Sequence, residues 1–396
     1  MVMAMVFLNA PRFSVPSFVE PVLGPKTTAS PGPGFNNSGA VDFSETGVSG
    51  DSFDTFGCKV FNPLTAKTPD WQSANAYFER KSFNDGTLVM SDGVNIPHWG
   101  FEDRLRLKGK KFFPSPLIRV QEGDMVHVKL EARNNTHTIH HHGIEPTTMN
   151  DGVGHVSFET SGAYVYQWQP KHAGTWFYHC HKNTVLHFEM GLYGLLIVDP
   201  KPDQYGRVNA YTGGPFYTPS RERFWVFDDI DPRWHTLDDN AGLCGDDAGL
   251  NVFQPKYFFV NGIENTKCKA HTGVRIQAYP GEKVLIRMLN ASYSIVKVTI
   301  EQLRGDIISI DGHALNTSER PWTSWIPVAA GEPMFFPTAT RQDLLIDLDP
   351  TKNSFVRGRE YKVVFEFQDW IKRTIHNANA PKPVNVGRAE TVIKIL

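Results

Sequence analysis

Two histidine-rich segments, roughly forty residues apart, place the tightest constraint on how this chain can fold. The first reads His137-Thr-Ile-His-His-His-Gly143, and the second reads His179-Cys-His181 and is followed by His187. Together they supply one thiolate and several imidazoles, a ligand set that suits copper. The spacing lets one domain build a copper site from these segments and hold four more imidazoles beside it.

Short apolar runs separated by turns extend along most of the chain, which carries 33 glycines and 27 prolines. Residues 117–120 and 125–130 are expected to be strands joined by a turn at 121–124. The other strands expected are 164–168, 176–178, 194–198, 224–227, 257–260, 284–289, 307–310, 344–348, 361–367 and 391–395. Regularly spaced short strands with intervening turns predict an all-β sandwich or barrel.

The order of strands and turns repeats, which indicates a divergent internal duplication. We expect an extended N-terminal arm over residues 1–70, because this segment is rich in Pro, Gly, Ser and Asn and lacks periodicity. A copper-binding domain is expected over 71–205 and a second domain over 206–396. Where the second unit parallels the histidine-rich segments it reads 291–298 and 365–368, which contain no histidine. The second domain is therefore expected to be free of copper.

Charge and hydropathy exclude two classes of partner. The formal net charge is −2 and no basic patch stands out, so nucleic acid is not an expected partner. No apolar run approaches the roughly 20 residues that span a bilayer.

Residues 1–10 are apolar and resemble, at most, a trimmed signal segment. We expect a periplasmic or extracellular protein.

The four cysteines have different predicted roles. Cys180 belongs to the metal motif, and Cys58 lies in a loop-like region with no obvious partner. Cys244 and Cys268 lie in one later domain and either form a disulfide or remain buried thiols.

His137 from the first segment, with Cys180 and His187 from the second, predicts a mononuclear copper centre. A blue copper site uses one thiolate, two imidazoles and a weak or absent axial ligand. Cys180 is the thiolate, His187 on the following loop is one imidazole, and His137 on an earlier strand is the other.

Strand alternation predicts a second group of imidazoles. If Cys180 points into its own domain, then His179 and His181 point the opposite way. His140 and His142 share a parity and face together, whereas His141 is expected to point the other way. Four imidazoles would therefore gather outside the domain, bonded in sequence to the thiolate.

These motifs, with residues 116–120, 121–124, 150–152 and 173–178, resemble the multicopper oxidases, the laccase-like family of linked domains. The resemblance is strong over about residues 90–200 and fainter over 222–396. It implies two cupredoxin-like Greek-key β-sandwich or barrel domains and a type 1 copper on His137, Cys180 and His187. It also implies that four residues form half the ligands of a type 2/type 3 copper cluster: His140, His142, His179 and His181. In that family, an electron crosses from the cysteine through its histidine neighbours, and dioxygen is reduced to water.

The chain departs from the family pattern at the axial position. That position falls on Leu192, where many relatives carry methionine, and an apolar residue there leaves copper three-coordinate. Met190 is close in sequence and remains an alternative axial ligand, although we favour a packing role for it.

The second departure concerns the cluster. The family's cluster takes eight histidines from two domains, but the later unit offers only His235, His271, His313 and His376, none paired as His-x-His. Only His313 is a candidate ligand supplied by a neighbouring chain, and we favour a surface or structural role for it. Two-domain relatives form trimers with the cluster at the interface, so another chain is expected to complete it, in a homo-oligomer that could be a trimer.

Two alternatives to an oxidase stay open. A trimeric copper nitrite reductase is one, but that family has an aspartate where this chain has His140 and a non-histidine where it has His181. An electron carrier or copper-binding protein without a complete cluster is the other. The electron donor is open among phenols, metal ions and redox proteins.

Overall fold

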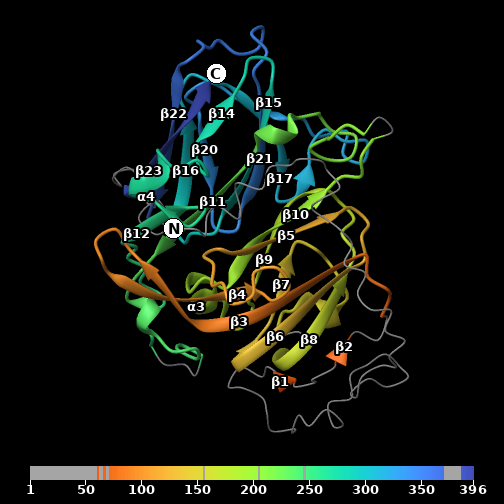
Figure 1. Cartoon of the computed structure of the whole chain (residues 1–396), viewed down its shortest axis with the longest axis vertical. Coiled ribbons are helices and arrows are strands. Elements are labelled where there is room, and N and C mark those ends of the chain that lie inside the picture. Colours follow the sequence, from red (N-terminus) through yellow and green to blue (C-terminus); the bar gives the residue numbers. More distant parts are fainter. Residues whose placement is uncertain are drawn as a thin grey trace.

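The computed structural model describes residues 60–61, 66–67, 71–154, 157–203, 206–243, 247–369 and 385–396. These residues form two packed β-sandwiches, one mainly orange to yellow-green and one mainly cyan to blue in Figure 1. No helix in this part of the chain is long and apolar enough to cross a membrane. The helical segments are short: α2 (Thr148–Asp151), α3 (Thr184–Glu189), α4 (Asn265–Cys268), and the 3-10 turns η2 (Pro219–Arg221) and η3 (Trp234–Thr236).

The first sandwich holds both histidine-rich segments. One sheet has the order β1-β8-β6-β3-β4, with β2 also paired to β8, and the other has the order β5-β10-β9-β7. Their bounds are β1 (Val60–Phe61), β2 (Ala66–Lys67), β3 (Ala76–Val89), β4 (Asn95–Asp103), β5 (Ser115–Gln121), β6 (Val126–His137), β7 (His140–His142), β8 (Glu159–Trp168), β9 (Gly174–His179) and β10 (Tyr193–Asp199).

The second sandwich repeats this pairing. Its sheets have the orders β13-β12-β11-β15-β21-β17-β18, with β19 on β17, and β14-β23-β22-β16-β20. Their bounds are β11 (Glu222–Ile230), β12 (Tyr257–Val260), β13 (Ile263–Glu264), β14 (Ile276–Ala278), β15 (Lys283–Asn290), β16 (Ile295–Ile300), β17 (Gly305–Ile310), β18 (His313–Ala314), β19 (Ile326–Val328), β20 (Pro333–Phe336), β21 (Arg341–Asp347), β22 (Glu360–Gln368) and β23 (Asn385–Ile395).

The two sandwiches share the same pairing around two of their strands. In the first, β6 pairs in parallel with β3 and antiparallel with β8, and β15 has the same relation to β11 and β21. Likewise β10 lies between parallel β5 and antiparallel β9, as β23 lies between β14 and β22. This is the arrangement expected from an internal duplication, and it confirms the all-β prediction. The segment after β22 corresponds to the metal loop after β9, and its residues 370–384, with His376, lie outside the described residues.

Most expected strands lie within observed ones. Residues 117–120 and 125–130 are strands joined by a turn, but β5 and β6 belong to different sheets, so that the turn crosses the sandwich. A hairpin joins β12 to β13, with Asn261 and Gly262 at the turn in positive φ angles of 57° and 70°. β1 and β2, at the end of the expected arm, pair in parallel with β8 of the same chain. Residues 1–59, with Cys58, and also Cys244 lie outside the described residues, and Cys268 is a free buried thiol.

A buried ion network joins the two sandwiches. Arg287 on β15 contacts Glu222 on β11 (Nε to Oε1, 2.9 Å) and Asp343 on β21 (Nη1 to Oδ2, 3.0 Å). From the first sandwich, Arg119 contacts Glu222 at 2.9 Å and the Thr175 hydroxyl donates to Asp343 at 2.5 Å. Burial alone would raise the pKa of Glu222, but the two guanidinium groups hold it below its usual value. The network therefore fixes how the domains meet.

Replacing Arg287 by methionine is expected to lower the free energy of unfolding by about 3–5 kcal/mol, because it leaves the buried Asp343 without its cation and Glu222 with Arg119 alone. Chemical denaturation with a fluorescence readout measures this change. Lys352→Met removes a cation that is 57% exposed and should cost less than about 1 kcal/mol. Equal effects for the two variants would contradict the assigned role of the network.

Candidate metal centre

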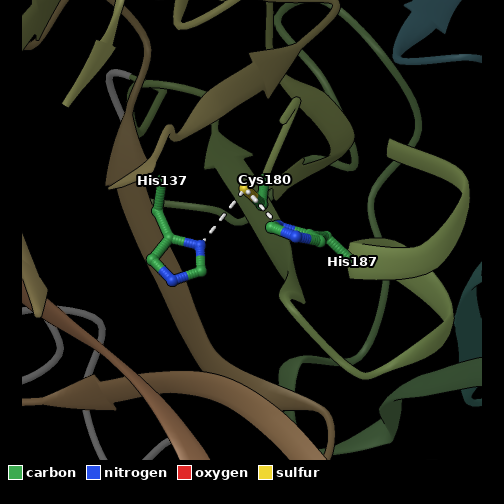
Figure 2. A group of neighbouring side chains, drawn as sticks. All are labelled: His137, Cys180 and His187. Carbon is green, nitrogen blue, oxygen red and sulfur yellow. Dashed lines mark hydrogen bonds between the residues drawn. The ribbon is translucent and has the colours of Figure 1, made fainter. Parts of the chain in front are cut away.

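One thiol and two imidazoles converge at one end of the first sandwich. The Cys180 Sγ lies 3.3 Å from Nδ1 of His187 and 3.7 Å from Nδ1 of His137. In Figure 2 both rings point a nitrogen at the sulfur from opposite sides. His137 ends β6, Cys180 follows β9, and His187 lies on α3, so two strands and one short helix position the group.

Burial and charge favour a thiolate in this group. Cys180 and His187 are fully buried and His137 is 3% exposed. Burial is the largest single effect and opposes charge on both Cys180 and His187, but it is outweighed by their mutual attraction together with the hydrogen bonds to His137 and Asp239. These effects combined lower the pKa of Cys180 well below its usual value and raise the pKa of His187 to about 9. A thiolate with two imidazole nitrogens is the donor set of a soft transition metal site.

The spacing also fits a bound metal ion. Ligand nitrogens and sulfur at about 2.0–2.3 Å from one trigonal ion would lie roughly 3.5–3.7 Å apart, and the two observed distances are close to this value. Leu192 and Met190 are both buried in the same apolar cluster as Cys180. The Leu192 carbonyl accepts a hydrogen bond from the Cys180 amide at 2.9 Å, which ties the end of the loop to its start. These residues fit copper.

The outer edge of His187 is held by the second domain. Its Nε2 lies 3.0 Å from the carbonyl oxygen of Asp239 and 3.2 Å from its Oδ1. The Lys182 Nζ lies 2.7 Å from the other carboxylate oxygen. Contacts of this kind fix the ring of a metal ligand and its tautomer. Sequence reasoning missed Asp239, because the contact joins residues 52 positions apart and no motif marks it.

Four further imidazoles gather next to this group. β7 pairs with β9 so that His140 lies opposite His179 and His142 opposite Phe177. The ring of His140 lies 5.4, 5.3 and 5.4 Å from three other rings, those of His142, His179 and His181 respectively. One nitrogen from each of His140, His142 and His179 lies within 4.8 Å of the others. The structure thus brings together all four residues expected to face the same way.

Hydrogen bonds select which nitrogens are available in this cluster. His140 uses Nδ1 toward the Asp151 carbonyl at 2.7 Å, and His179 uses Nδ1 toward the Cys180 carbonyl at 2.8 Å. Both rings therefore keep Nε2 for a ligand. His142 instead directs Nδ1 at Nε2 of His179, at 3.3 Å. Because Nδ1 of His179 donates to a carbonyl, its Nε2 accepts in this contact and Nδ1 of His142 donates, so a cation bound here would replace that proton.

The cluster lies beside the second domain, where His179 is buried and the other three histidines stay partly exposed. Phe177 belongs to the apolar cluster between the sandwiches, and its ring stacks on that of His142 with centroids 4.3 Å apart. The guanidinium of Arg341, from the second domain, lies 5.2 Å from the Phe177 ring centre. His179 is only 4% exposed. The second domain therefore borders the histidine cluster of its own chain.

Four other histidines named in the sequence analysis lie elsewhere in the described part of the chain. His141 points into the first sandwich, as expected, and its ring lies 4.9 Å from that of Trp168. His235 contacts the Pro97 carbonyl at 2.5 Å, and His313 accepts from Arg320 at 2.9 Å. His271 contacts the amide of Gly273 at 3.1 Å. None of these four belongs to either metal-ligand group found among the described residues.

Comparisons with known proteins match the first sandwich more strongly than the second. Residues 80–203 match a family model described as multicopper oxidase. Copper resistance protein A of Escherichia coli is 28% identical over 241 residues, which are 51% of this chain and 38% of that protein. A copper-containing nitrite reductase of Neisseria meningitidis serogroup B is 27% identical over 140 residues, 34% of each chain. The chain therefore spans about two-fifths or less of these relatives' lengths.

The fold is also found in solved structures. The blue copper oxidase from Nitrosomonas europaea superposes with a TM-score of 0.56 at 22% identity, covering 81% of this chain and 85% of that one. Likeness at this level of identity establishes the shared fold.

Proposed function

We propose, from the premise that residues 80–203 form a domain of the multicopper oxidase family, that the chain is a copper-dependent oxidase. It would take electrons from a donor and pass them to dioxygen. The observation that supports this most strongly is a short covalent path between the two groups of candidate ligands. Cys180, in the first group, is flanked in sequence by His179 and His181, whose rings belong to the four-histidine cluster. An electron carrier needs only the first group.

The residues of the chain divide the work as follows. His137, Cys180 and His187 would hold a type 1 copper, and Leu192 stands where many relatives carry the axial methionine. His140, His142, His179 and His181 would hold type 2/type 3 copper. When bound there, copper supplies one-electron redox chemistry at the first site and the site of dioxygen reduction at the second. Asp239 orients His187, and the Asp151 carbonyl orients His140.

We further propose a division into an arm (1–70), a copper-binding domain (71–205) and a copper-free second domain (206–396). The two sets of paired sheets support this division. Since one chain offers four clustered histidines, a neighbouring subunit in a homo-oligomer, for which a trimer is the simplest arrangement, would complete the cluster. A periplasmic or extracellular location is part of the same proposal.

Measuring the number of copper ions per chain, together with the electron paramagnetic resonance spectrum of the same sample, tests the proposed oxidase function. We expect about four copper ions per chain and both type 1 and type 2 signals if the cluster is complete. About one copper with a type 1 signal alone would overturn the oxidase proposal in favour of electron transfer. About two coppers with a type 2 signal would favour a reductase, although the imidazoles of His140 and His181 in the cluster argue against it.

A further inference from the structure

A loop of the second domain covers the outer edge of the candidate type 1 site. This covering loop, residues 231–243, connects β11 toward β12 and includes η3. Its Trp234 and Ala241 side chains are buried in the apolar cluster of the first sandwich. His187 beneath it is fully buried, so no molecule from solvent reaches that imidazole while the loop stays in place.

One ion pair between the domains holds the loop at the site. Lys182, two residues after Cys180, contacts the Asp239 carboxylate at 2.7 Å, and the two side chains are 7% and 10% exposed. The neighbouring Asn183 amide donates to the carbonyls of Asp239 and Ala241 at 3.2 and 3.0 Å. Both oxygens of the Asp239 carboxylate are therefore engaged, one by Lys182 and one by His187.

This pairing has a chemical consequence for the donor. A free carboxylate at the edge of His187 could accept a proton from an organic donor that gives up an electron in contact with the imidazole. Here Lys182 already neutralises that carboxylate, and the loop occupies the position that such a donor would need. Opening the loop would break the ion pair and both Asn183 hydrogen bonds and would expose Trp234 and Ala241, so the closed position is favoured.

We propose that Lys182 is a specificity-determining residue, which locks the covering loop through Asp239 and excludes neutral organic donors from the edge of His187. The lock favours donors that deliver an electron across the loop without touching the imidazole. This inference rests on the proposed function for its meaning, but the lock itself is a property of the metal-free protein and is testable there.

Amide hydrogen exchange on the metal-free protein tests the lock. The double variant Lys182→Met/Asp239→Asn removes both charges and leaves no unpaired ion, and Lys182→Arg retains the pair. We expect amides within 236–243 to exchange at least about tenfold faster in the double variant and to be nearly unchanged in Lys182→Arg. Matched controls are Lys171→Met and Asp238→Asn, which alter an exposed lysine and the exposed carboxylate next to Asp239. Unchanged exchange in the double variant would overturn the lock.

Anaerobic reduction of the copper-loaded protein tests selection of the donor. We expect hydroquinone to bleach the blue band at least about tenfold faster in Lys182→Met, which keeps the contact between Asp239 and His187, while hexaammineruthenium(II), which needs no contact, changes by less than about threefold. Equal acceleration with both reductants would overturn the specificity claim. Absence of a blue band in the native protein would instead refute the type 1 site, and the exchange comparison would then decide the lock alone.

Discussion

Cys180→Ser should abolish the blue absorption of the copper-loaded protein and its electron transfer, while leaving the fold intact. The colour of such centres depends on a thiolate bound to copper, and a serine hydroxyl at the same position is not deprotonated by two imidazoles. Donor oxidation should fall by about 10³-fold or more, because the only sulfur ligand is lost. Visible absorption and steady-state turnover measure the two effects.

The fold should tolerate this change, because serine is nearly the size of cysteine. Cys180 is fully buried, so a cost of about 1–2 kcal/mol in the free energy of unfolding is expected for the metal-free protein. The matched control is Cys268→Ser, which alters the other buried free thiol in the described residues, in the second sandwich. An unchanged spectrum in Cys180→Ser, or its loss in Cys268→Ser, would refute the assignment of the thiolate.

The grouping of the site was predictable because it depends on strand parity and short spacing. Alternation along β9 places Tyr178 and Cys180 in the first core, whereas Phe177 and His179 face the second domain. That rule, applied to residues 137–142 and 179–181 alone, predicts two groups of ligands on opposite sides of one sheet. In the structure the members of each group lie close to one another, as predicted.

Contacts across the domain seam were not predictable in this way. Asp239 reaches His187 and Arg341 reaches Phe177 from the second domain, and neither lies in a motif. The same limit applies to sheet membership: the sequence predicts strands at 117–120 and 125–130, but which sheet each joins depends on packing between residues far apart in the chain. Long strands such as β3 were also missed, because Asn84, Asp85 and Gly86 interrupt the apolar pattern.

His140→Ala should separate the two halves of the proposed reaction. His140 lies at the centre of the cluster, with three other imidazole rings within 5.4 Å, and its position is fixed by the Asp151 carbonyl. It contributes nothing to the group formed by His137, Cys180 and His187. The blue band should therefore remain, and anaerobic reduction of that band by a donor should keep its native rate.

Dioxygen consumption by the same variant should fall by about 10²-fold or more, because an incomplete cluster binds its copper poorly and offers electrons no acceptor site. Stopped-flow reoxidation of the reduced protein measures this step directly. His172→Ala, which removes a histidine that is 46% exposed and lies outside the cluster, should leave both half-reactions unchanged. If His140→Ala is reoxidised by dioxygen at the native rate, the four-histidine cluster is not where the electrons go. The protein would then work as a carrier between its donor and another acceptor.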